Sequence, residues 1–304
     1  MNDDPNWPRA SDWLAGDHEP DPAATLAVIG APLHLGSLSG GRFDLAPDAI
    51  RTALRRFSTF ADGIDVRTVA VKDAGDLAIA GSRPETALRE IAGAVGGTLD
   101  TYDVAIILGG DNSITRPACR GLGPDLSRIG LLTLDAHHDL RDLDDGLSNG
   151  NPIRALLEDG LPGDHIVQVG IQAFANSRAY AHVAREAGIT VITAPEVRTR
   201  GIEAIVSEAL DVLALQTDRI YVDLDLDVLD RAFAPACPGS RPGGLSSSEI
   251  LPAAQLAGTH PKVRAIDIVE IDPTNDVADV TVLTAAACLL SFAAGVASRG
   301  KEQG

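Results

Sequence analysis

The chain has 304 residues, of which 45% are apolar, and its mean hydropathy is +0.07, so we expect a globular protein rather than a disordered or membrane-embedded one. It carries 43 acidic residues against 25 basic ones, which gives a formal charge of −18. Nucleic acids and anionic membranes bind basic surfaces, and this charge therefore argues against both as partners. A solvated acidic surface explains most of the carboxylates. The remaining question is whether some of them gather to hold cations.

Cysteine usage and the lack of targeting signals predict a cytoplasmic protein. The cysteines are few, odd in number and form no CxxC pair, which is typical of reduced thiols. Residues 1–24 form a polar extension without the apolar core of a signal peptide, and the apolar run 285–297 is too short to span a bilayer. We therefore expect one domain over residues 25–304, with a buried helix at 285–297. The cysteines are Cys119, Cys237 and Cys288.

Short β-branched apolar runs alternate with longer helical stretches along the chain, which predicts a parallel sheet with helices on both faces. Eight strands can close into a barrel or stay open between two helix layers, and periodicity leaves this choice open. The predicted strands are residues 26–31, 67–71, 104–109, 129–134, 166–170, 189–192, 219–224 and 264–269. The predicted helices lie near residues 47–57, 84–100, 113–122, 176–187, 201–215, 247–257 and 281–297.

Two acidic motifs directly follow predicted strands, where ligands collect in parallel α/β folds. The first is Asp135-Ala136-His137-His138-Asp139. In extended backbone, residues two apart point to the same side, so Asp135, His137 and Asp139 are expected to converge while His138 points away. The second motif, Asp225-Leu226-Asp227, has the same alternation.

Carboxylates gathered in this way repel one another unless a cation lies among them. Four carboxylates and one imidazole suit Mn²⁺ or Mg²⁺ better than Zn²⁺. The spacing also fits a two-metal site, which generates hydroxide near neutral pH. Any single aspartate could instead cap a helix or face water, but the two motifs together favour metal binding.

Two further polar segments follow predicted strands. The segment Gly109-Gly110-Asp111-Asn112-Ser113 lacks the Gly-Lys-Ser/Thr of a phosphate-binding loop, and its glycines more simply permit a tight turn. Glu270 ends a buried apolar run, where a lone carboxylate needs a cationic partner. It is therefore either a structural acid or the group that receives a cationic substrate.

Five segments carry a resemblance to a known family. They are GGRFDLAPDAIR at 40–51, GGDNS at 109–113, DAHHD at 135–139, DLDLDVLD at 223–230 and VEIDP at 269–273. In this order they resemble the ureohydrolase family of arginases, agmatinases and formiminoglutamases, over nearly the whole chain. The resemblance implies a three-layer α/β/α sandwich on an eight-stranded parallel sheet, a dinuclear Mn²⁺ site, and homotrimers or homohexamers.

The resemblance also assigns metal ligands. One family ligand, the histidine of GGDHS, is Asn112 here. An amide oxygen is a weaker, uncharged ligand, so we expect Asn112 to coordinate weakly and to leave one tight ion and one that is easily lost. The ligands implied are Asp135, His137, Asp139, Asp225 and Asp227, together with Asn112.

The loop after DAHHD resembles that of the formiminoglutamase branch. Asn149 stands where arginases and agmatinases carry a histidine thought to shuttle protons. The pattern DAHxDLR followed by S-x-G-x-P-x-R also matches this branch. The resemblance therefore implies hydrolysis of the formamidine C–N bond of N-formimino-L-glutamate to glutamate and formamide by a metal-bridging hydroxide. Glu270 would receive the amidinium, and Asp139 would move the proton to the leaving nitrogen.

A dicarboxylate substrate needs cationic side chains, and the arginine fork matches carboxylate geometry. Arg141 and Arg154 are the candidates, with Asn149 as a third substrate-binding residue, although both arginines could instead form ion pairs within their acidic loop. Two other functions stay open. One is a guanidino hydrolase that acts on a small cationic guanidine and releases urea, and the other is a non-catalytic family member that binds a ligand.

Overall fold

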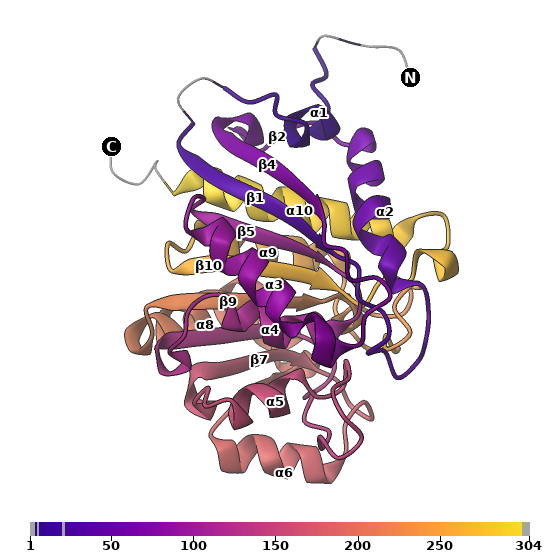
Figure 1. Cartoon of the computed structure of the whole chain (residues 1–304). Coiled ribbons are helices and arrows are strands. Elements are labelled where there is room, and N and C mark those ends of the chain that lie inside the picture. Colours follow the sequence, from indigo (N-terminus) through magenta and orange to yellow (C-terminus); the bar gives the residue numbers. More distant parts are fainter. Residues whose placement is uncertain (1–3, 5, 20–21, 300–304) are drawn as a thin grey trace.

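An eight-stranded parallel sheet forms the centre of the computed structural model, which describes residues 4, 6–19 and 22–299 (Figure 1). All eight predicted strands are present. The strand order is β4-β1-β5-β10-β9-β6-β7-β8, so β4 and β8 are free edges and the sheet stays open. The strands are β1 (Ala24–Ala31), β4 (Val69–Asp76), β5 (Val104–Gly109), β6 (Ile129–Leu134), β7 (Ile166–Ile171), β8 (Thr190–Thr193), β9 (Arg219–Asp225) and β10 (Val263–Val269). A short antiparallel hairpin of β2 (Phe60–Ala61) and β3 (Ile64–Asp65) was not expected.

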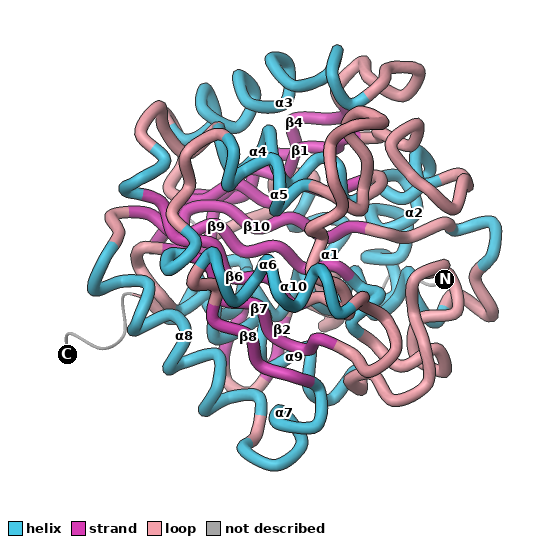
Figure 2. Tube along the Cα trace, turned by 90° about the horizontal axis from the view of Figure 1, so that it is seen from below, coloured by secondary structure: helices cyan, strands magenta, loops and turns pink. Residues whose placement is uncertain are grey.

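Helices cover both faces of this sheet, which makes the predicted three-layer sandwich (Figure 2). Because each face of a parallel strand is buried, the strands are apolar throughout rather than alternating. One layer contains α1 (Ala10–Leu14), α2 (Ala46–Ala53), α7 (Ala194–Arg200), α8 (Ile202–Gln216), α9 (Ser247–Thr259) and α10 (Val280–Ser298). The other contains α3 (Pro84–Leu99), α4 (Thr115–Arg120), α5 (Pro152–Glu158) and α6 (Arg178–Ala187).

Three helices, α1, α5 and α7, were missed by sequence patterning because they have only five to seven residues each. Such lengths show barely two turns of apolar periodicity. Helix α1 lies within the predicted polar extension, yet Trp13 is fully buried there and its indole Nε1 donates to Val69 O at 2.9 Å. Helix α1 of the extension is therefore packed onto the domain.

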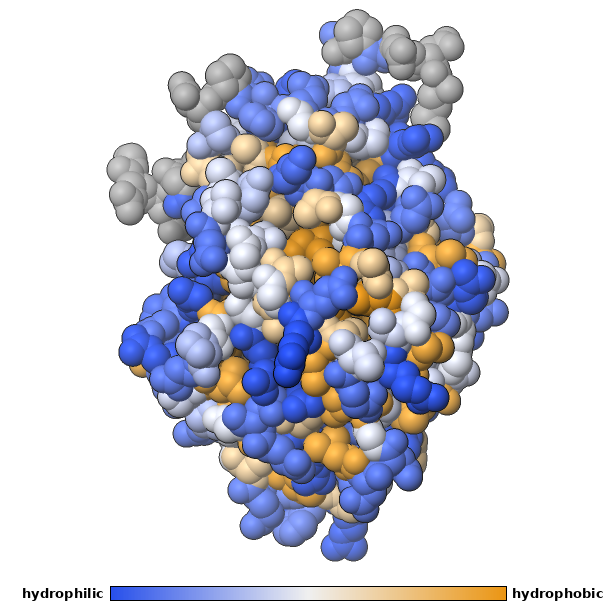
Figure 3. Space-filling view, viewed as in Figure 1, coloured by the Kyte–Doolittle hydropathy of each residue, from blue (hydrophilic) through white to orange (hydrophobic). Residues whose placement is uncertain are grey.

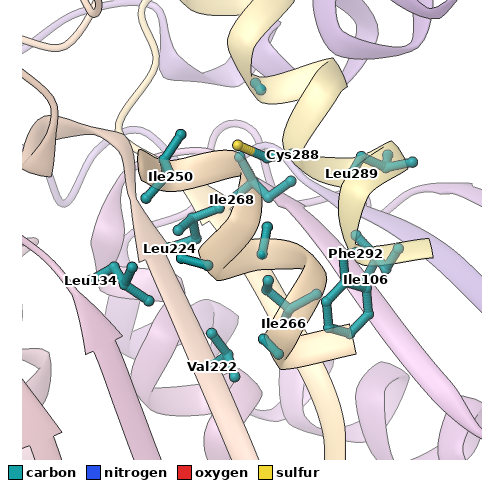
Figure 4. Packing of buried hydrophobic residues seen from close by; sticks show 14 of the residues in the cluster. Ile106, Leu134, Val222, Leu224, Ile250, Ile266, Ile268, Cys288, Leu289 and Phe292 are labelled. Atoms are coloured by element: carbon teal, nitrogen blue, oxygen red, sulfur yellow. The ribbon is translucent and has the colours of Figure 1, made fainter. Parts of the chain in front are cut away.

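Helix α10 is the predicted buried helix. Its length and apolar composition alone would allow it to cross a membrane, but 72% of its most apolar window is buried in the protein. Leu289 and Phe292 of α10 lie beside sheet residues such as Ile106 and Ile266 in the core (Figure 4). The three cysteines are also buried and unpaired, as packing residues are. Hydrophilic side chains cover most of the face that Figure 3 shows, as expected for an acidic, solvated surface.

Helices α9 and α10 approach closely at two glycines. A Cβ on Gly295 would lie 2.0 Å from Gln255 O and 2.8 Å from the Cα of Gly258. Any side chain there must push the helices apart, because backbone atoms cannot move aside individually.

Gly295→Ala should therefore lower the free energy of unfolding by about 1–3 kcal/mol, as overpacking does. Gly93→Ala in α3 is the matched control, because a Cβ at Gly93 meets no atom within 4 Å. It should raise the free energy of unfolding by about 0.5–1 kcal/mol, the usual cost of a helical glycine. Urea denaturation of both variants measures the difference, and equal stability of the two would contradict the close contact.

Candidate active site

The predicted site residues come from four neighbouring strands in the middle of the sheet. Strands β5, β10, β9 and β6 are adjacent in that order, and their carboxyl ends share one edge. Asn112 follows β5, Glu270 follows β10, Asp225 ends β9, and the motif 135–139 follows β6. The topology therefore brings together side chains that are up to 158 positions apart in the sequence.

Turns bring the aspartates together. The sequence-based expectation that the alternation of extended backbone does so is wrong. Asp135 Oδ1 accepts a hydrogen bond from the His137 backbone N–H at 2.6 Å, and Asp225 Oδ1 accepts one from the Asp227 N–H at 2.8 Å. These are Asx-type turns, in which the first carboxylate fixes the residue two positions later. Asp139 has a positive φ of 52°, so the backbone there has left the extended conformation.

His137 lies between two of the carboxylates. Its Nδ1 is 2.9 Å from Asp227 Oδ2 and 3.5 Å from Asp135 Oδ1. The candidate ligand atoms of these three residues all lie within 4.8 Å of one another. His138 points elsewhere, as expected, and its Nδ1 is 2.7 Å from Gln168 Oε1.

Burial makes this cluster electrostatically costly. Burial, and then Asp227, raise the pKa of Asp135 to about 7. Burial likewise raises the pKa of Asp139 and of Asp225 well above the ordinary value, with neighbouring aspartates adding to the shift. Burial alone would lower the pKa of His137, but Asp227 and Asp135 raise it to about 12. One imidazole cannot balance four buried carboxylates.

The donor set fits divalent cations. Several carboxylate oxygens and a single imidazole nitrogen at one buried place are the ligands that Mn²⁺ or Mg²⁺ prefer. The cations would also supply the positive charge that the described residues of the cluster lack. The five side chains that would hold them are Asp135, His137, Asp139, Asp225 and Asp227.

Asn112 lies against the same cluster. Its Nδ2 donates to Asp139 Oδ2 at 2.6 Å, while its Oδ1 is 2.6 Å from Thr115 Oγ1. The residue is almost fully buried, with 1% of its surface exposed. The structure thus places Asn112 beside one predicted ligand, and its coordination of a metal stays a prediction.

Glu270 is held by two hydrogen bonds to one of its oxygens. Oε1 accepts the Asn112 backbone N–H at 2.8 Å and Asn149 Nδ2 at 2.9 Å. No described residue donates to Oε2, so this oxygen can pair with a ligand. Burial, and then Asp111, raise the pKa of Glu270 to about 8. A cationic ligand would favour its ionised form.

The pocket above the cluster contains Arg141 and Asn149, as predicted, and also Arg241, which sequence reasoning missed. The nearer nitrogen of the Arg241 guanidinium, Nη1, lies 3.3 Å from His137 Nε2. Arg241 belongs to a long irregular segment after β9, and no strand-end pattern marks it. Arg154 is outside the lining residues, and its Nη2 donates to Leu140 O at 3.1 Å.

The pocket is a cavity of about 160 Å³, a size that admits small molecules only. Its floor is tight around the cluster: a Cβ on Gly239 would lie 2.0 Å from Asp227 Oδ2. Both carboxylates and two arginines line the pocket. The pocket thus offers negative charge for a cationic group and positive charge for an anionic one. The lining includes Leu38, His137, Asp139, Arg141, Asn149, Asp225, Asp227, Arg241 and Glu270.

Comparison with known proteins agrees with this fold. The sequence matches the arginase family over residues 24–295. A formimidoylglutamase of Halalkalibacterium halodurans is 38% identical over 276 residues, which cover 89% of this chain and 86% of that protein.

Solved structures give the same picture. The crystal structure of formimidoylglutamase from Bacillus subtilis is similar with a TM-score of 0.90 and 34% identity, and covers 98% of this chain and 94% of that one. Trypanosoma cruzi formiminoglutamase with Mn²⁺ is similar with a TM-score of 0.86 and 26% identity, and covers 96% of this chain and 99% of that one. The chain therefore belongs to the arginase family, and the predicted fold is confirmed.

Stability should depend on pH without divalent cations and should lose this dependence when they are bound. Carboxyl groups of the unfolded chain ionise near pH 4, whereas Asp135 and Glu270 have pKa values of about 7 and about 8 in the folded protein. In EDTA the folded state therefore binds more protons between these limits, and the free energy of unfolding falls as pH rises from about 4 to 8.

Saturating Mn²⁺ should remove this loss, because bound cations stabilise the ionised carboxylates. Thermal denaturation at pH 5–8, in EDTA and in Mn²⁺, measures the two profiles. Parallel profiles would show that the cluster does not bind the metal.

Proposed function

We propose that this chain is a Mn²⁺-dependent hydrolase that cleaves the formamidine C–N bond of N-formimino-L-glutamate and releases glutamate and formamide. The observation that carries the proposal is the charge pattern of one pocket. Glu270 and the carboxylate cluster line the same pocket as Arg141 and Arg241. The proposed substrate has a cationic formamidine at one end and two carboxylates at the other, so its charges complement those of the pocket.

The similarity to formimidoylglutamases supports this choice of substrate. The relatives named above carry that name at 38% and 34% identity and align over most of their length. An arginine fork binds a carboxylate through two parallel N–H donors, so the two arginines suit a dicarboxylate better than a purely cationic guanidine. Arg154 has a structural role instead, because its Nη2 donates to the backbone carbonyl of Leu140.

Two Mn²⁺ ions, when bound by the aspartates and His137, would supply a hydroxide nucleophile at neutral pH and neutralise developing negative charge. The other steps depend on side chains of this chain. Glu270 is fixed through Oε1 and directs Oε2 at the amidinium, which orients the carbon for attack.

Asp139 is the group that carries the proton. Its carboxyl is buried in the cluster at the floor of the pocket, and burial favours its protonated form. In its ionised form it takes the proton from the oxygen that has added to the amidinium carbon, and it gives this proton to the glutamate nitrogen as the C–N bond breaks. The oxygen of water then belongs to formamide, and the amino group of glutamate leaves with the transferred proton.

The remaining expectations rest on composition and family likeness. Unpaired, buried cysteines fit a reducing compartment, so we place the enzyme in the cytoplasm. Family resemblance implies a homotrimer or homohexamer.

Incubation with N-formimino-L-glutamate and Mn²⁺ should release formamide and glutamate without urea. The same protein should not release urea from agmatine, arginine or guanidinobutyrate, because agmatine has no carboxylate and the other two have only one for the two pocket arginines. Product analysis of this substrate panel is the test. Urea from a guanidine would favour the guanidino hydrolase, and no product from any substrate would favour a binding protein.

Arg141→Ala and Arg241→Ala should each raise KM by about tenfold or more, because a charge-assisted hydrogen bond contributes about 1.5–3 kcal/mol. Arg89→Ala, an exposed arginine of α3 outside the pocket lining, is the matched control. Steady-state kinetics with N-formimino-L-glutamate gives KM for each variant. An unchanged KM in both pocket variants would remove these arginines from the substrate site, and a large rise in Arg154→Ala would return Arg154 to it.

A further inference from the structure

Beneath the metal cluster, a short chain of polar side chains leads from Asn112 into the core. Thr115 Oγ1 lies 2.6 Å from Asn112 Oδ1 and 2.7 Å from Asp267 Oδ2. Thr115 and Asp267 are both fully buried. They come from α4 and β10, so the chain exists only because β5, which leads into α4, pairs with β10.

A threonine hydroxyl has one proton, so it can donate to Asn112 or to Asp267 but not to both. Asp267 is the stronger acceptor because it is a carboxylate, and charge-assisted hydrogen bonds are roughly twice as strong as neutral ones. Its oxygens already receive Tyr221 Oη at 2.7 Å and the Leu224 N–H at 3.2 Å. A carboxylate has about four acceptor sites, so Asp267 can accept the Thr115 proton in addition to these two donors.

If Thr115 donates to Asp267, the hydroxyl can only accept from Asn112. Two oxygens 2.6 Å apart without a proton between them repel, so the Asn112 amide must turn by 180° and direct Nδ2 at Thr115. The amide has the same shape in both orientations, and the surrounding hydrogen bonds decide which is adopted. After the turn, Oδ1 faces Asp139 and the metal cluster instead of Nδ2.

We propose that Thr115, held by Asp267, is the positioning residue that presents the oxygen of Asn112 to the metal site. An amide oxygen can bind a cation, whereas an amide NH₂ cannot. Thr115 makes this orientation stable because its hydroxyl offers Nδ2 an acceptor. Without that acceptor, binding of a cation by Asn112 leaves a buried N–H₂ without a partner, which is costly.

The proposal rests on the metal assignment of the proposed function and not on its substrate. The test therefore measures Mn²⁺ binding in the absence of substrate, on the full chain freed of metal by EDTA and dialysis. Free Mn²⁺ is measured by its electron paramagnetic resonance signal during titration, which gives the stoichiometry and a dissociation constant for each ion.

Thr115→Val removes the hydroxyl and keeps the side-chain shape. This variant should raise the dissociation constant of the more loosely held Mn²⁺ by about tenfold or more, because it removes a partner that orients a ligand. The dissociation constant of the tighter ion should stay unchanged. Thr115→Ser keeps the hydroxyl and should restore the affinity. Thr115→Ala replaces the valine variant if the latter does not fold, as judged by thermal unfolding in EDTA.

Thr133→Val is the matched control. Thr133 is also fully buried and lies on β6, but its hydroxyl has no hydrogen-bond partner among the described residues. The same substitution there should leave both Mn²⁺ affinities unchanged. Wild-type affinities in Thr115→Val, an equal loss in Thr133→Val, or no recovery in Thr115→Ser would each overturn the proposal. Two bound ions without hydrolysis of N-formimino-L-glutamate would instead count against the proposed function alone.

Discussion

Repulsion among buried carboxylates is the constraint on which this site depends. Four aspartates and Glu270 lie almost fully buried at one edge of the sheet, with one imidazole among them. Such an arrangement is unfavourable unless cations neutralise it, and the fold must hold it in place against that cost. The four central strands provide this rigidity, because each strand is paired on both sides and the core fixes its position.

The same constraint shapes the layer beneath the cluster. Asp223 and Asp267 lie opposite each other on β9 and β10, and Asp223 is two residues before the predicted ligand Asp225. Burial, and then Asp267, raise the pKa of Asp223 well above its ordinary value. Asp267 is stabilised by donors from two elements, α4 and β9, and it also connects this layer to Asn112 through Thr115. The metal site and the interior of the sheet are thus one polar network rather than a surface site on an inert core.

The pocket adds specificity through two opposite charges. The cluster and Glu270 attract a cation, while Arg141 and Arg241 attract anions, and both sets line one small cavity. A ligand that carries both charges can satisfy both sets of side chains. Asn149 stands in the position where the resemblance to arginases implies a histidine. Its Nδ2 donates to Glu270 and so helps to hold this carboxylate for a cationic group. An amide, unlike an imidazole, does not titrate near the reaction.

The sequence by itself determined the eight strands, the two acidic motifs and the family, because apolar runs and strand-end motifs are local and the motifs are specific in combination. It did not determine the short helices α1, α5 and α7, nor that Asx-type turns rather than extended backbone direct the aspartates together. Only the tertiary structure brought Arg241 into the pocket and left Arg154 outside it. Only the pairing of β5 with β10 placed Thr115 between Asn112 and Asp267. These contacts join residues far apart in sequence, and no local pattern encodes which distant side chain will complete a hydrogen bond.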